Sequence, residues 1–158
     1  MYANQVLSQE FKFAMRKYAY SVSIVSNTSN EGINNAITIS SFTSISLDPP
    51  SILMCINKNS SFHKTLLIDS IFCINLLNKK QKEIAELCAN PIRSDERFDN
   101  NKWIKSNPPK LLGALVHLTC SVDKVIDYET HSIIIGIVKE STTSKHQNTL
   151  MYKNKKFL

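Results

Sequence analysis

The stretch AITISSFTSISLDPP, residues 36–50, decides the fold. Its first half alternates apolar Ile37 and Ile39 with polar Thr38 and Ser40, as a strand does when it buries one face. The letters SSFTS then have to leave the strand and turn, so hydroxyls and unpaired backbone N–H groups gather where the strand ends. Such a cluster suits a flat, hydrogen-bonding heterocycle or a phosphate. The alternative is an ordinary turn rich in Ser and Thr that satisfies its own backbone.

A second polar cluster, INKNSSFHKT, covers residues 56–65 and also follows a predicted strand. Ser60 or Ser61 stands where the N-cap of a short helix belongs, and Lys58 is close by. A capped helix start beside a cation favours phosphate. The alternative is that the serines only cap the helix and Lys58 is solvated. Together the two clusters indicate a ligand with one aromatic and one phosphorylated end.

The remaining pattern predicts short strands and few helices. Phe11, Met15 and Tyr18 share one helical face, and alternating or β-branched runs indicate strands. The expected elements are a helix over 7–18, a hairpin of strands over 20–27 and 33–39, strands at 51–57 and 71–77 with a short helix over 61–70 between them, a helix over 79–90, an irregular excursion over 90–110 anchored by Trp103, a long strand over 114–123, its partner over 131–140 and a last strand over 150–153.

About seven strands with few helices predict a mainly β protein, built as a closed or nearly closed antiparallel barrel, because closure removes exposed strand edges. Gly136 inside the strand over 131–140 predicts a bulge or a close approach to the backbone. With 158 residues and 42% hydrophobic content, we expect one domain over residues 1–158.

Composition argues against several classes of protein. No apolar run is long enough to span a membrane, and the start of the chain is too polar for a secretory signal, so we expect a cytoplasmic protein. Its four cysteines form no C-x-x-C pair, which argues against a disulfide framework or a zinc site. The net charge of +6 suits an anionic partner, either a small phosphorylated ligand or nucleic acid, although no zinc-finger or RRM signature occurs.

The block from Ser40 to Pro50 resembles the core of the flavin reductase family. The family pattern runs close to G-M-T-A-S-S-F-T-S-V-S-L-D-P-P, then N-R-S-S, a helix and F-x-V-N-x-L, and this block departs from it mainly at Ile45. The likeness extends along nearly the whole chain, through FAMRKYAYSVSIVS, ERFDNNKW, LLGALVHLTCSVDKVID, HSIIIGIV and LMYKNKKF. It implies an FMN-binding split β-barrel, a Greek-key antiparallel barrel with short helices.

The resemblance also implies where the cofactors bind. The flavin ring is bordered by Thr38, Ile39, Ser40 and Ser41 and closed off by Phe42, the ribityl phosphate end lies at Asn57, Lys58, Ser60, Ser61 and Phe62, and His131 lies beside the nicotinamide of the reducing partner. No residue is assigned as a catalytic acid, base, nucleophile or metal ligand. Hydride transfer between two stacked rings is a positioning task and needs none of these groups.

Four further residues depart from the family pattern. Glu129 and Thr130 replace the Gly and Asp of the G-D-H motif that ends in His131, Ile39 replaces an Ala, and Ala36 replaces a Gly. The change in the G-D-H motif bears on the handling of the nicotinamide more than on flavin binding.

The implied function is an NAD(P)H-dependent flavin oxidoreductase that reduces FMN or FAD by hydride transfer. The family further implies a homodimer and, frequently, a separate monooxygenase as the acceptor of reduced flavin. Two alternatives remain. One is a flavin-binding electron-transfer or sensory module without turnover, and the other is a small barrel that binds nucleic acid or another anion.

Overall fold

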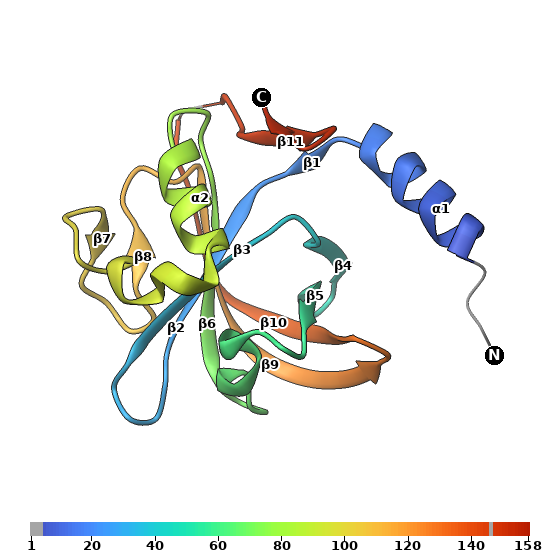
Figure 1. The fold of residues 1–158 in the computed structure, drawn as a ribbon. Helices are drawn as coiled ribbons and strands as arrows, with labels where there is room; N and C mark the ends of the chain where they lie inside the picture. The colour runs from blue at the N-terminus through green and yellow to red at the C-terminus, as the bar shows by residue number, and fades with distance from the viewer. Residues whose placement is uncertain (1–4, 146) are drawn as a thin grey trace.

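The computed structural model describes residues 5–145 and 147–158, and its centre is a curled, seven-stranded antiparallel sheet (Figure 1). The strands are β2 (Ser23–Thr28), β3 (Asn34–Ile39), β4 (Thr43–Leu47), β5 (Pro50–Asn57), β6 (Ile71–Leu76), β9 (Val116–Tyr128) and β10 (His131–Thr143). Their order in the sheet is β3-β2-β6-β9-β10-β5-β4. The predicted hairpin of strands over 20–27 and 33–39 is confirmed as the antiparallel pair β2 and β3.

Short elements surround this sheet. They are the helices α1 (Gln5–Lys17) and α2 (Lys82–Ala89), the 3-10 helices η1 (Ser61–Thr65) and η2 (Pro91–Glu96), and the short strands β1 (Tyr20–Ser21), β7 (Trp103–Ile104), β8 (Lys110–Leu111), β11 (Met151–Lys153) and β12 (Lys156–Phe157). The predicted helices over 7–18 and 79–90 are confirmed, and the short helix expected over 61–70 is a 3-10 turn that ends at Thr65.

The sheet is a nearly closed barrel with one open seam. Its two edge strands, β3 and β4, are joined by only three residues, 40–42, so the sheet curls until its first and last strands meet. Ser41, in the connection between β3 and β4, bonds to β5 through its side chain: Oγ donates to the Cys55 carbonyl at 2.9 Å and accepts from the Cys55 N–H at 3.2 Å. The Ser41 hydroxyl therefore extends the hydrogen bonding of β5 beyond its last pair with β4, Leu53 with Thr43.

Two apolar clusters lie on opposite faces of β2. Val25 points into the barrel, where it packs with Met54, Phe62 and Phe72. Ile24 points outward into a second cluster, which α2 covers (Figure 1). Burial of both faces explains why five of the six residues of β2 are buried.

Gly136 shows both features that its position in the strand predicted. The register of β10 against β9 shifts between Ile135 and Gly136, so a bulge lies there. The Phe72 ring also approaches so closely that a Cβ on Gly136 would lie 2.6 Å from Cζ of that ring. A glycine is required here by space.

The excursion between α2 and β9 is anchored as predicted. Trp103 Nε1 donates to the Arg97 carbonyl at 2.7 Å, and its ring packs on Phe98 with centroids 4.6 Å apart. These contacts fix Arg97 against the outer edge of β3.

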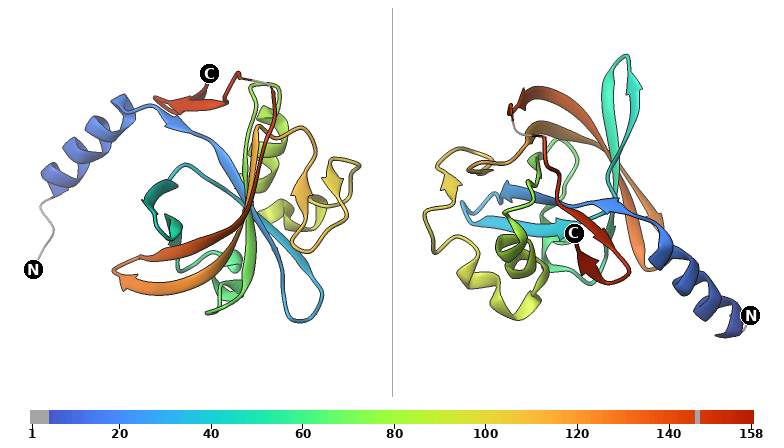
Figure 2. Two further views of the ribbon diagram at one scale, coloured as in Figure 1. Left: turned by 180° about the vertical axis from the view of Figure 1, so that it is seen from behind. Right: turned by 90° about the horizontal axis from the view of Figure 1, so that it is seen from above.

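α1 extends away from the rest of the protein (Figure 2). None of its residues is buried, and Phe11 is 64% exposed. Within residues 5–145 and 147–158, no helix is long and apolar enough to cross a membrane, and no group of His, Cys, Asp and Glu side chains has a metal-binding arrangement.

Candidate functional site

The outer edge of β3 is the organising feature of the site. As an edge strand, β3 has a row of backbone groups without a strand partner. Two side chains bridge this edge to the neighbouring helical segment: Thr38 Oγ1 donates to the Ala85 carbonyl at 2.7 Å, and Arg97 Nη1 donates to the Ala36 carbonyl at 2.5 Å. The outer edge of β3 is therefore covered by α2 and η2. One hollow lies on each side of the hydrogen bonds that join β3 to these helices.

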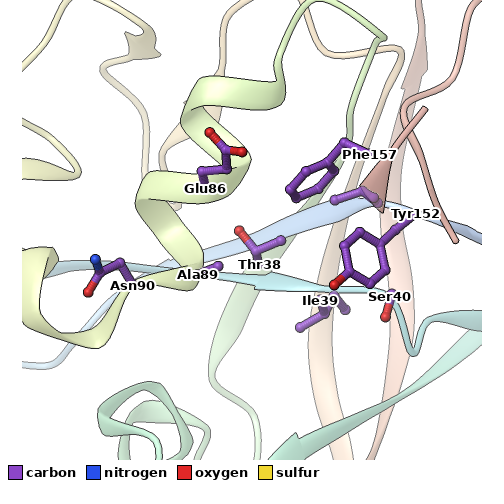
Figure 3. Close-up of a pocket in the computed structure, with 9 residues that line it drawn as sticks. Thr38, Ile39, Ser40, Glu86, Ala89, Asn90, Tyr152 and Phe157 are labelled. Atoms are coloured by element: carbon purple, nitrogen blue, oxygen red, sulfur yellow. The ribbon is translucent and has the colours of Figure 1, made fainter. Parts of the chain in front are cut away.

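The first hollow, here called the β3 pocket, lies between β3, α2 and the C-terminal strands and has a volume of about 470 Å³ (Figure 3). Its floor is apolar, and polar groups line its rim. The floor includes Val22 and Phe157, and the rim includes Thr38, Ser40, Glu86, Asn90 and Tyr152. Ile39 also borders the pocket, but its side chain packs in the barrel core. This size and this mixture are typical of sites for small organic ligands.

Ser40 has a free hydroxyl on this rim, as does Tyr152. Within the described chain, no hydrogen bond to either hydroxyl is present, and Ser40 is exposed. Thr38, by contrast, uses its hydroxyl hydrogen on Ala85, so towards a ligand it can only accept. Ser40 is thus the side-chain donor available from the strand end.

The second hollow, here called the arginine cleft, lies between β3, η1 and η2. The residues that matter for its chemistry are Ala36, Ser61, Ser94, Asp95 and Arg97. Both hollows border β3. Asn90 connects them, because the residue lines the β3 pocket and its carbonyl accepts from Arg97 Nη2 at 2.8 Å.

The structure does not bring all the predicted site residues together. Thr38, Ile39 and Ser40 line the β3 pocket. The Ser41 hydroxyl is bonded to Cys55 of β5, and Phe42 is half-buried and packs against the barrel core. These five residues still form one continuous stretch along the rim.

The predicted phosphate residues have other partners. Asn57 accepts from the Asn59 N–H at 2.8 Å, and Ser60 caps η1 by accepting from the His63 N–H at 3.2 Å. The Lys58 ammonium pairs with Asp127 at 3.3 Å. The Ser132 hydroxyl and then Lys58 hold the pKa of Asp127 below its usual value, as donors to a carboxylate do.

Two further predicted residues lie in contrasting surroundings. Phe62 is 1% exposed and belongs to the barrel core, and it also borders the arginine cleft. His131 is exposed at the start of β10, pairs in register with Asn57, and its Nδ1 lies 2.8 Å from the Thr130 hydroxyl. It lies outside both hollows, and its place beside a nicotinamide stays a prediction.

Arg97 and the residues from α2 and the C-terminal strands were not foreseen as site residues. Arg97 was part of the ERFDNNKW match, but nothing in the local pattern separates it from a solvated surface arginine. The only sequence feature that sets Arg97 apart is its place beside Phe98 in an otherwise polar segment. The contributions of Glu86, Asn90, Tyr152 and Phe157 depend on how distant segments pack, which local patterns do not report.

Comparison with known proteins gives the family. A family model described as "Flavin reductase like domain" matches residues 15–158. The chain belongs to that family. Among its relatives is the reductase component of the FADH(2)-dependent resorcinol hydroxylase of Rhizobium sp. (strain MTP-10005), 26% identical over 98% of this chain and 88% of that protein.

Two further similar proteins are also described as flavin reductases. The FMN reductase (NADH) RutF of Agrobacterium fabrum is 28% identical over 95% of this chain and 87% of its own length. The solved structure of BorF, the flavin reductase component of a bacterial two-component tryptophan halogenase, superposes with a TM-score of 0.86 at 29% identity and covers 96% of each chain. The predicted mainly β, antiparallel fold is thus confirmed in a whole-length comparison.

Proposed function

We propose that this family member is an NADH-dependent flavin reductase that binds FMN or FAD with the ring in the β3 pocket. The pocket carries the proposal: it lies on the strand end that the family uses, and its apolar floor and polar rim fit a flat aromatic ring with a hydrogen-bonding edge. The NADH-dependent FMN reductase among its relatives supports the choice of donor. The open seam between β3 and β4 fits the split barrel expected from the sequence.

The residues around the pocket divide the binding task. The Ser40 hydroxyl donates to the polar edge of the ring, whereas the Ile39 side chain packs in the barrel core behind the strand. Ser41 keeps both of its hydrogen bonds to Cys55, so its role is to hold the backbone of the rim in place. When bound, the flavin supplies the hydride-accepting ring. The protein supplies orientation and exclusion of water, which suffice for this reaction class.

Turnover with free flavin tests the proposal. Purified protein is mixed with FMN and NADH, and NADH consumption is followed together with flavin binding. The proposal predicts both binding and consumption. Binding without consumption would instead identify a flavin-binding module, for which the altered G-D-H motif at Glu129 and Thr130 is the supporting feature. Neither binding nor consumption would contradict the proposal altogether.

A pair of serine variants locates the ring. Ser40→Ala is expected to weaken flavin binding by roughly fivefold to tenfold, the effect of losing one hydrogen bond to a neutral acceptor. Ser44→Ala is the matched control, because Ser44 is exposed on β4 and does not line the pocket. Equal affinities for both variants would remove Ser40 from the site.

We also propose that the protein is a homodimer and that it serves a monooxygenase or a similar flavin-using enzyme. α1 has its apolar side chains exposed, and a 13-residue helix without a buried residue is marginal in water by itself. A second copy of the chain would cover it. The relative from Rhizobium is the reductase component of a hydroxylase, which supports an acceptor enzyme of that class.

A further inference from the structure

We propose that the tip of the β9–β10 hairpin of a second copy of the chain docks between α1 and the β11–β12 hairpin. This inference rests on the homodimer proposed above, since it names the two surfaces that meet. The contact is reciprocal: each copy offers one receiving hollow and one hairpin tip, so a closed two-fold dimer uses the same pair of surfaces twice.

The receiving surface, here called the α1 hollow, lies between α1, β1 and the C-terminal strands and has a volume of about 550 Å³. Its apolar part comes from α1 and the residues that follow it, and its charged part comes from α1 and the β11–β12 hairpin. The apolar residues include Phe11, Met15, Tyr18 and Tyr20, and the cations are Lys12, Arg16, Lys153 and Lys155. No acidic residue lines the α1 hollow within residues 5–145 and 147–158.

The cations of the α1 hollow have no carboxylate partner in the described part of the chain. The hollow also has a fixed shape. The Asn154 N–H donates to the Arg16 carbonyl at 2.9 Å, and the rings of Tyr18 and Tyr20 lie 4.8 Å apart. An occupant that is apolar at its centre and acidic at its edges therefore complements this surface.

The tip of the β9–β10 hairpin, residues 123–130, has that composition. Every residue of the tip is exposed, and Tyr128 is 69% exposed. Its large apolar side chains are Val125, Ile126 and Tyr128, and its charged residues are Asp123, Lys124, Asp127 and Glu129. In a chain with a net charge of +6, this acidic and apolar tip is complementary to the α1 hollow.

The tip is held in place before a partner binds. Ser132 Oγ donates to Asp127 Oδ1 at 3.0 Å, and the Lys58 ammonium lies 3.3 Å from the same oxygen. The Lys58 N–H also donates to the Thr130 carbonyl at 3.1 Å. α1 and the hairpin tip project from the same side of the protein (Figure 1, Figure 2). Two preformed surfaces on one side suit a reciprocal contact, because docking then costs little conformational entropy.

An exchange of charges between the two surfaces tests the inference by sedimentation velocity. One variant reverses the hollow, with Lys12→Glu and Lys153→Glu, and another reverses the tip, with Asp123→Lys and Glu129→Lys. All four residues are exposed, so the substitutions leave the fold intact. Each variant alone is expected to dimerise at least about tenfold more weakly than the wild type at low ionic strength, because like charges then face each other. An equimolar mixture is expected to form mixed dimers with close to wild-type affinity, because both contacts again pair opposite charges.

The matched control is Lys79→Glu with Lys80→Glu, which changes the net charge as the hollow variant does, at exposed positions outside the α1 hollow. It is expected to dimerise as the wild type does. At about 1 M salt, where the screening length is about 3 Å, the differences between all these variants should largely disappear.

Cross-linking locates the contact independently of charge. The background is Cys55→Ser, because Cys55 is the cysteine that is not fully buried. Chains with Phe11→Cys are mixed with chains with Ile126→Cys and treated with a short bifunctional thiol reagent. The expected product joins one chain of each kind, as mass spectrometry identifies. Gln9→Cys, on the opposite side of α1, is expected to give little of this product.

The outcomes separate this inference from the dimer on which it rests. A dimer whose affinity neither charge reversal changes would overturn the inference and leave the homodimer intact. Two variants that dimerise weakly and do not recover when mixed, or a cross-link that forms equally from Gln9→Cys, would also overturn it, because the two surfaces would then not meet. A wild-type protein that stays monomeric would contradict the proposed homodimer itself.

Discussion

Gly136 shows how a single residue sets the packing of the barrel. The Phe72 ring fills the space where a side chain at position 136 would lie, and Cys120 Cβ is also within 3.3 Å of that space. Since Phe72 is fully buried, its ring has little room to move. The bulge in β10 and the ring position therefore depend on each other.

Gly136→Ala is expected to destabilise the protein by about 1–3 kcal/mol through overpacking. Phe72→Leu frees space, so the double variant should be more stable than the sum of the two single changes predicts, by at least about 1 kcal/mol. Urea unfolding of the four proteins measures this coupling. Strictly additive effects would show that the contact with Phe72 is not the cause.

Glu129 stands where the family has the Gly of its G-D-H motif, and its backbone has a φ of 45°. The left-handed conformation that Gly adopts freely is thus present, although the side chain disfavours it. Glu129→Gly is expected to stabilise the fold by up to about 1 kcal/mol. Glu31→Gly is the control, because Glu31 lies in a turn and has no positive φ. Thermal unfolding should show that this variant loses stability. A gain in stability similar to that of Glu129→Gly would contradict the explanation.

At this scale the sequence predicted local features around the pocket and not the contacts between distant segments. Hydroxyls after a strand were enough to place Thr38, Ile39 and Ser40 at the pocket. The expectation for Lys58 rested on its closeness in sequence to Ser60, whereas Arg97, 61 residues along the chain from Ala36, reaches the same strand edge by tertiary packing. Local patterns carry no information on such a contact.

Among the elements, α1 exposes several large apolar side chains. Phe11 and Tyr18 are 64% and 62% exposed, and Met15 lies on the same side of the helix. An exposed stripe of this kind marks an interaction surface. In the proposed dimer it is the surface that a second copy covers.

Phe11→Glu is expected to convert the dimer into monomers, because it places a charge in that apolar surface. Gln9→Glu introduces the same charge on the opposite side of α1 and should leave the dimer intact. Sedimentation velocity at matched concentrations distinguishes the two variants. A monomeric wild-type protein, or a dimeric Phe11→Glu variant, would argue against α1 as the interface.

The elements themselves were readable because their periodicity is strong. The helix over 79–90 and the hairpin over 20–39 appear close to the predicted bounds. The turn at η1 was read as a longer helix, since an N-cap serine precedes 3-10 and α-helical turns alike and only the backbone distinguishes them. The pairing of strands adjacent in sequence, β2 with β3 and β9 with β10, was predicted. The pairing of β6 with β2 and β9 and of β5 with β10 was not, as periodicity reports which face is buried and not what buries it.

For the whole molecule, the pKa values and accessibility of the cysteine thiols show how well the interior excludes water. Burial raises the pKa of Cys73, Cys88 and Cys120 to about 12, so these thiols remain protonated near neutral pH. Cys55 is only half-buried. The free thiols thus differ in their access to reagents.

A thiol-specific reagent at pH 8 is expected to modify Cys55 first and the other three cysteines only when the protein unfolds. Timed modification in buffer and in denaturant, followed by mass spectrometry, gives the order. Rapid modification of Cys73 or Cys120 in buffer would contradict the closed packing of the barrel.

The central claim is that a flavin lies along the outer edge of β3. A crystal structure determined after soaking with FMN tests it most directly. We expect the ring in the β3 pocket, beside Thr38 and Ser40. A flavin bound elsewhere on the protein, or a pocket that stays empty at saturating FMN, would contradict this account.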